Sequence, residues 1–159
     1  FAGEMGHISI DFNGRLCNCG NRGCLEAYVS ATGIKNTIQK LLEKDPQNTL
    51  LQTLCKDNID GFLLDKSYDK GNETAIKIYH YTGEKLGQGL ALLANLLSPE
   101  AFIFYGGFSN AGERIFASAR KSMKHNLINS SEKDIKLIQS GLAKGQAGIL
   151  GAASLIWTK

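Results

Sequence analysis

Apolar side chains recur at helical spacing from Leu25 through the middle of the chain. The repeat predicts helical structure over residues 24–43, and Gly33 is expected to divide it into two helices. Ser30 or Thr32 would then cap the second helix. Shorter helical segments are predicted at residues 49–56 and 59–64, separated by polar loops.

The longest repeat predicts a helix at residues 72–97, with Asn72 suited to cap its first turn. Ser98-Pro99 ends it, because proline cannot continue a helix. Gly83 and Gly87 share one face of this helix, although each glycine costs about 1 kcal/mol relative to alanine there. We therefore expect this face to pack closely against a neighbouring helix or strand.

The last third of the chain alternates between strand and helix patterns. Residues 101–105 form a continuous apolar, aromatic-rich run, which is typical of a buried strand in a parallel sheet. A further strand is predicted at 135–138, with helices at 111–125 and 145–157. This alternation favours an α/β domain. Near the other end, alternation over residues 8–12 predicts a short strand followed by a turn at Asn13-Gly14.

Composition and charge exclude several classes of protein. The 159 residues suffice for one domain with its own core, and 43% apolar with 21% charged residues is ordinary for a soluble globular protein. The net charge of +3 comes from scattered side chains, which argues against a nucleic-acid surface. No apolar run approaches the ~18 residues of a membrane span, and no signal peptide is apparent. We expect a cytoplasmic location, where cysteines serve as metal ligands.

One histidine and three cysteines occur within 18 residues, at His7, Cys17, Cys19 and Cys24. Three thiolates and one imidazole make a complete tetrahedral set for a structural zinc ion, with no open position for water. The alternative is a pair of reactive or disulfide-bonded thiols, although a direct bond between Cys17 and Cys19 would be strained. Cys55 is expected to occupy space in the core or on the surface, without a part in the metal site.

The segments GEMGH (3–7) and CNCGNRGCLE (17–26) resemble the signature of the ROK family of repressors, open reading frames and sugar kinases. The resemblance implies an actin-like, ribonuclease H-like ATPase fold, of which this chain would be the large C-terminal domain. We expect a single domain over 1–159, with a zinc loop (3–26), a helical segment (27–98) and a nucleotide-side segment (101–158). The chain begins at Phe1, inside the motif, so we expect a portion of a longer protein.

The resemblance also implies roles for individual residues. In ROK sugar kinases two glutamates and a histidine of this signature bind hydroxyls of the hexose. The matching positions in this chain are Glu4, His7 and Glu26. Gly106 and Gly107 resemble the turn that contacts adenosine in this superfamily, and Gly141 with the 145–151 segment is expected to add to the same pocket. Asp11 is expected to be a turn residue rather than a catalytic base, and His80 and His125 to be surface residues.

The function implied is that of a glucokinase-type enzyme, which transfers phosphate from ATP with Mg²⁺ to a hexose or N-acetylhexosamine. Kinases of this family take their base from an Asn-Asp motif upstream of GExGH. No such motif occurs here, so we expect no catalytic residue in this chain and no activity from it alone. The alternative is the sugar-sensing half of a ROK repressor, although the run 27–33 resembles the kinases more. A free-standing zinc module that binds nucleic acid or protein is a third hypothesis. We also expect a homo-oligomer.

Overall fold

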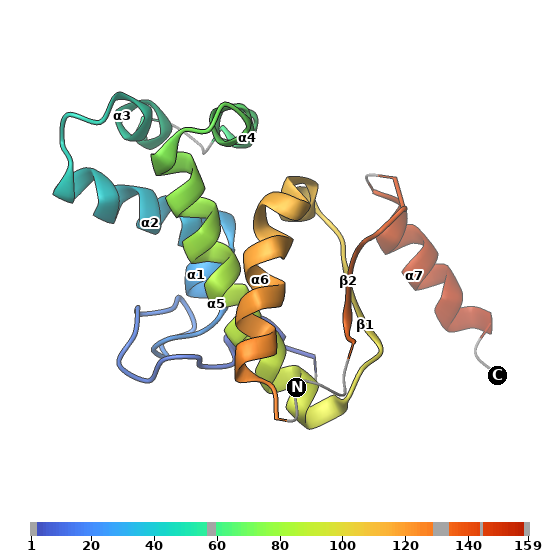
Figure 1. Cartoon of the computed structure of the whole chain (residues 1–159). Helices are drawn as coiled ribbons and strands as arrows, with labels where there is room; N and C mark the ends of the chain where they lie inside the picture. Colours follow the sequence, from blue (N-terminus) through green and yellow to red (C-terminus); the bar gives the residue numbers. More distant parts are fainter. Residues whose placement is uncertain (1–2, 57–59, 129–133, 144, 158–159) are drawn as a thin grey trace.

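A computed structural model describes the chain except residues 1–2, 57–59, 129–133, 144 and 158–159. Figure 1 shows helices on one side of the molecule and a small sheet with a last helix on the other. The helices are α1 (Glu26–Val29), α2 (Ala31–Lys44), α3 (Thr49–Cys55), α4 (Gly61–Asp69), α5 (Glu73–Leu97), α6 (Glu113–Asn126) and α7 (Gln146–Trp157). The strands are β1 (Ala101–Phe104) and β2 (Lys136–Gln139), and short 3₁₀ turns are η1 (Met5–His7) and η2 (Gly107–Ala111).

The long helix α5 is the central element, with α1, α2 and α4 against one side and α6 against the other (Figure 1). Its first turn is capped as expected, because the Asn72 side chain accepts hydrogen bonds from the backbone N–H groups of Thr74 and Ala75. Its buried face joins α2–α4 and α6 in one hydrophobic core. Ile38, Leu51 and Ile78 of this core are at most 1% exposed.

Gly83 and Gly87 make the close packing of α5 against α6 possible. A β-carbon at Gly83 would lie 2.5 Å from the carbonyl oxygen of Ile115, and one at Gly87 would lie 2.6 Å from Cβ of Ser122. Both distances are far below a normal carbon contact, so only glycine fits there at this helix spacing. The expectation drawn from these two glycines is therefore confirmed.

The two strands form a parallel sheet, and α6 is the connection between them. Phe102 pairs with Leu137 and Phe104 with Gln139. Phe104 packs on Phe116 of α6, with ring centroids 4.9 Å apart. The α/β class and the parallel pairing are confirmed, but the strand is not fully buried, because Ile103 on its other face is 70% exposed.

Two local predictions are wrong. Residues 8–12 form no strand; Ser9 makes only an isolated antiparallel bridge with Cys24, because the chain turns at Asp11 to close the cysteine loop. Two helices form as expected, with Ser30 as the predicted cap, but the break between them lies at Ser30 and not at Gly33. The Ser30 hydroxyl accepts from the backbone N–H of Gly33, so α2 begins at Ala31 and Gly33 lies inside its first turn.

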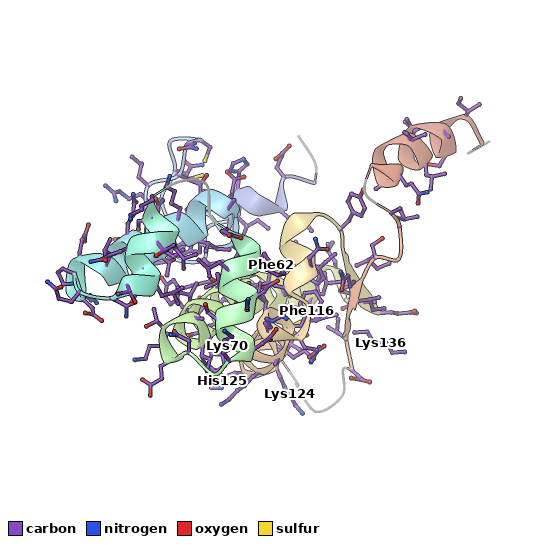
Figure 2. All side chains as sticks on the ribbon, turned by 90° about the horizontal axis from the view of Figure 1, so that it is seen from above. Phe62, Lys70, Phe116, Lys124, His125 and Lys136 are labelled. Atoms are coloured by element: carbon purple, nitrogen blue, oxygen red, sulfur yellow. The ribbon has the colours of Figure 1, made fainter. Side chains whose placement is uncertain are left out.

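Helix α7 stands apart from the rest of the molecule, and Figure 2 shows the same separation from above. Its apolar side chains face outward, with Leu155 and Ile156 each 77% exposed. Within the described part of the chain, none of the helices is both long enough and apolar enough to cross a membrane.

Candidate functional site

The cysteine loop is held by backbone contacts rather than by an apolar core. Isolated bridges join Ser9 to Cys24 and Leu16 to Arg22. At the tip of the loop, the Cys17 N–H donates to the Asn21 carbonyl oxygen at 2.8 Å. These contacts bring the cysteines back toward η1, the short turn that carries His7.

The four predicted ligands come together. The ligand atoms of His7, Cys17, Cys19 and Cys24 all lie within 4.8 Å of one another. His7 Nδ1 is 3.7 Å from Cys17 Sγ, and Cys19 Sγ is 3.6 Å from Cys24 Sγ. Around an ion with Zn–S bonds of 2.3 Å, the edge of a sulfur tetrahedron is about 3.8 Å. The donor set and its spacing therefore fit zinc.

Burial makes the three thiols unequal. Cys24 is fully buried, and burial together with the neighbouring thiols of Cys19 and Cys17 raises its pKa to about 12. Cys19 is exposed, and a hydrogen bond from the Asn21 backbone lowers its pKa to about 7. Three thiolates at this spacing repel one another, and a bound divalent cation would remove the obstacle to ionising Cys24.

Gly23 allows the loop to close. Its φ is +71°, a conformation that favours glycine, and a β-carbon there would overlap the carbonyl oxygen of Asp11. Asp11 in turn accepts a hydrogen bond from the backbone N–H of Asn13 at 3.1 Å. Asp11 is thus a turn residue, as expected.

The other ring nitrogen of His7 faces two carboxylates. His7 Nε2 lies 3.9 Å from Glu4 Oε2 and 3.9 Å from Glu26 Oε2. Glu26 is the first residue of α1, while Glu4 directly precedes η1. The structure therefore places the three residues expected to bind sugar around one point, on the opposite side of the imidazole from the thiols.

Arg15 joins the cysteine loop to the first two helices, a role that the sequence analysis missed. Its guanidinium donates to the carbonyl oxygens of Ala27 and Gly33 at 3.1 and 2.9 Å, and to the Thr37 hydroxyl at 2.9 Å. It also stacks over Tyr28, 4.8 Å from the ring centroid. Arg15 thereby fixes α1, and with it Glu26, against the loop. Its position between Gly14 and Leu16 gives no pattern by which this could be found.

A second candidate site lies at the carboxyl ends of the strands, where Gly106 and Gly107 follow β1. They border a cavity of about 650 Å³. Because neither glycine carries a side chain, the backbone itself forms part of the wall, and Gly106 has φ +109°, a conformation that favours glycine. Gly145 also lines this cavity, and its N–H donates to the Tyr105 hydroxyl at 2.6 Å. The remaining described lining residues are Asn110, Gln139, Ser140, Leu142 and Gly148.

The residues set aside by the sequence analysis lie outside both candidate sites. Cys55 is half-buried at the end of α3 and packs against the core. His80 and His125 are exposed, and Figure 2 shows His125 near the edge of the molecule. Gly141 was expected to add to the pocket beside Gly106, but it does not line that cavity, whereas Gly145 and Gly148 of the 145–151 segment do.

Comparison with known proteins identifies relatives of both expected kinds. The chain is 34% identical to a glucokinase of Thermotoga maritima over 155 residues, 96% of this chain and 48% of the relative. It is 25% identical to the DNA-binding transcriptional dual regulator NagC of Escherichia coli, over 97% of this chain and 36% of that protein. The chain thus spans about half the length of its glucokinase relatives.

A solved ROK family glucokinase from Streptomyces griseus, in complex with glucose and AMPPNP, has the same fold. It matches 97% of this chain with a TM-score of 0.81 and 33% identity, and the match covers 51% of that structure. The actin-like ATPase fold of ROK kinases therefore extends to this chain. The ROK family description matches residues 1–159 in full. The chain belongs to the ROK family.

Proposed function

We propose that this chain is the sugar-binding, zinc-containing part of an ATP-dependent hexose kinase of the glucokinase type. The identity to glucokinases and the likeness to a glucokinase bound to glucose and AMPPNP support this interpretation. Because the chain spans about half of these relatives, phosphoryl transfer is a property proposed for the whole protein.

The observation that carries the proposal is that the two ring nitrogens of His7 face different groups. Nδ1 lies 3.7 Å from Cys17 Sγ in the cysteine cluster, while Nε2 lies 3.9 Å from the carboxylates of Glu4 and Glu26. That distance is too long for a hydrogen bond, so the hydrogen-bonding capacity of Nε2 and the carboxylates is left for a ligand. Sugar hydroxyls would donate to the carboxylates in charge-assisted hydrogen bonds.

Zinc would act as a structural ion held by His7, Cys17, Cys19 and Cys24. When bound, it stabilises the loop and neutralises the thiolates. Residues of the protein orient the groups that would contact the sugar. The imidazole is oriented by its Nδ1 contact, and Arg15 holds the helix that begins at Glu26. Both carboxylates flank the position of the sugar.

Gly106 and Gly107 are proposed to contact the nucleotide in the cavity at the strand ends. A turn without side chains lets a ligand approach the backbone closely. ATP with Mg²⁺ would bind to the whole protein, with the base that deprotonates the sugar hydroxyl supplied outside this sequence. The chain alone should therefore bind sugar weakly and transfer no phosphate.

The NagC relative supports a second candidate, the sugar-sensing part of a ROK repressor. In that case the same carboxylates and histidine would bind an inducer sugar, and the sugar would not be phosphorylated. The two candidates differ in one readout. A kinase phosphorylates the sugar in the presence of ATP and Mg²⁺, whereas a sensor binds it unchanged and alters DNA binding by another part of its chain.

The experiment measures metal content by mass spectrometry and sugar affinity by calorimetry, with glucose and N-acetylglucosamine as ligands. We expect one zinc ion per chain. Glu26→Gln should weaken binding about tenfold or more, since a charge-assisted hydrogen bond is worth roughly 1.5–3 kcal/mol. Glu100→Gln, at an exposed glutamate outside the site, is the matched control. Equal affinities in the two variants would remove the proposed sugar site.

A further inference from the structure

Cys19 and Cys24 differ sharply in exposure although their sulfurs are neighbours. Cys19 is exposed at the tip of the loop, whereas Cys24 is 0% exposed. Their Sγ atoms lie 3.6 Å apart. We propose that these two cysteines form a peroxide-sensitive pair, in which oxidation to a Cys19–Cys24 disulfide releases the metal. The inference rests on the zinc site of the proposed function.

Cys19 and Cys24 are well placed to form a disulfide. Cys17 is only two residues from Cys19, which strains a direct bond, and its sulfur faces His7 Nδ1 at 3.7 Å. Four residues separate Cys19 from Cys24, and one of them, Gly20, has φ +90° and open space on the side where a side chain would project. The two sulfurs need to approach by about 1.6 Å to reach bonding distance.

The reaction requires only hydrogen peroxide. The Cys19 sulfur attacks one peroxide oxygen, the O–O bond breaks, and a sulfenic acid and one water form. The Cys24 sulfur then attacks the Cys19 sulfur and displaces hydroxide. Both sulfurs are thiolates while they hold the ion, so solvent supplies the two protons that turn the released oxygens into water. Two thiolates lose two electrons in total, and one peroxide is reduced to two waters.

Disulfide formation would remove two of the four ligands. His7 and Cys17 alone do not make a closed zinc site, so the ion would leave. His7 would then lose the contact that orients its ring, and Nε2 would no longer be held between Glu4 and Glu26. Oxidation at the exposed cysteine is thereby transmitted to the sugar contacts.

The test uses the zinc-loaded chain with Cys55→Ser, which leaves the three ligand thiols. Peroxide is added, zinc release is followed with a chromogenic chelator, and disulfides are located by mass spectrometry of unreduced peptides. We expect release of the bound zinc together with a Cys19–Cys24 peptide. Two further variants distinguish the role of Cys19 from that of Cys17. Cys19→His keeps four ligands but removes the exposed thiol, and Cys17→His keeps the proposed pair.

Cys19→His should release zinc about tenfold more slowly than the Cys55→Ser parent, whereas Cys17→His should remain sensitive. A disulfide to Cys17, or oxidation of Cys19 without a disulfide, would overturn the inference, even if a variant lost its metal. Zinc content and sugar affinity before oxidation test the proposed function separately. A chain that binds zinc and sugar but yields no Cys19–Cys24 peptide refutes only the redox pair.

Discussion

Gly23 is the residue at which the cysteine loop meets the turn at Asp11. A side chain there would overlap the Asp11 carbonyl oxygen and would also have to adopt a φ of +71°. We expect Gly23→Ala to lower the free energy of unfolding by about 3 kcal/mol or more, the sum of left-handed strain and overpacking. Zinc affinity should fall with it. Urea unfolding and competition with a chelator measure the two effects.

Gly20 provides the matched control for that substitution. It too has a positive φ, +90°, but no atom lies within 4 Å of a β-carbon built there. Gly20→Ala should therefore cost only the strain, about 1–2 kcal/mol. Equal losses at both positions would show that the approach to Asp11 is not what requires glycine at position 23.

Tyr79 gives the chain a pH dependence in the alkaline range. Burial, followed by its hydrogen bond to Asp65, raises the pKa of the Tyr79 hydroxyl above its usual value near 10. The folded state therefore keeps the proton while the unfolded chain loses it. Stability contributed by this residue is full below pH 10 and declines above it, by about 1.4 kcal/mol per pH unit.

The Tyr79→Phe variant isolates this contribution. It lowers stability at neutral pH through the lost hydrogen bond, but above pH 10 its unfolding free energy should fall less steeply than that of the parent chain. Urea midpoints between pH 9 and 11 give the two slopes. Parallel slopes would mean that Tyr79 does not titrate differently in the two states.

At the scale of elements, the contact between α5 and α6 depends on two positions without side chains. Replacing both Gly83 and Gly87 by alanine gains helix propensity but forces the helices apart, since the added carbons meet the backbone of α6. We expect a net loss of about 2 kcal/mol. Thermal unfolding, followed by far-ultraviolet circular dichroism, measures it.

Gly148 in α7 offers the contrasting case. No atom outside the helix's own backbone lies within 4 Å of a β-carbon built at this position. Gly148→Ala should therefore stabilise the helix by about 1 kcal/mol, the difference in propensity alone. If the Gly83 and Gly87 substitutions were also stabilising, the spacing of α5 and α6 would not be set by glycine.

The sequence predicted most elements because their local signals agree with their packing. Asn72 is both a good cap and the start of a strong apolar repeat, and the structure uses it as such. The break near Gly33 was misplaced because glycine usually disfavours the interior of a helix. Here Gly33 lies inside α2, where a β-carbon would collide with the backbone of Ala27 and Tyr28. That requirement is tertiary, so propensity could not reveal it.

The candidate site was predictable only in part, for the same reason. The His7 and cysteine ligands share a short loop, so spacing alone indicates that they can meet. The roles of Glu4 and Glu26 came from resemblance. Arg15 was missed because its partners, from Ala27 to Thr37, lie on helices whose packing on the loop is known only from the fold.

At the scale of the whole molecule, α7 leaves apolar side chains in solvent. Leu155 and Ile156 are each 77% exposed, with Ile149 close behind at 73%. Surfaces of this kind favour association. We expect the isolated chain to self-associate at high concentration, and Leu155→Lys with Ile156→Lys to shift it toward monomer in sedimentation velocity. Phe62→Lys, at an equally exposed residue on α4, is the control and should change association little.

The placement of His7 between the thiols and the carboxylates has a thermodynamic consequence. His7 points one nitrogen at the thiols and the other at the carboxylates, so occupancy on one side fixes the ring for the other. If zinc and sugar bind as proposed, the two affinities are reciprocally linked: whatever factor zinc adds to sugar binding, sugar adds to zinc binding. In a cell with scarce metal, bound sugar would then slow the loss of the zinc ion.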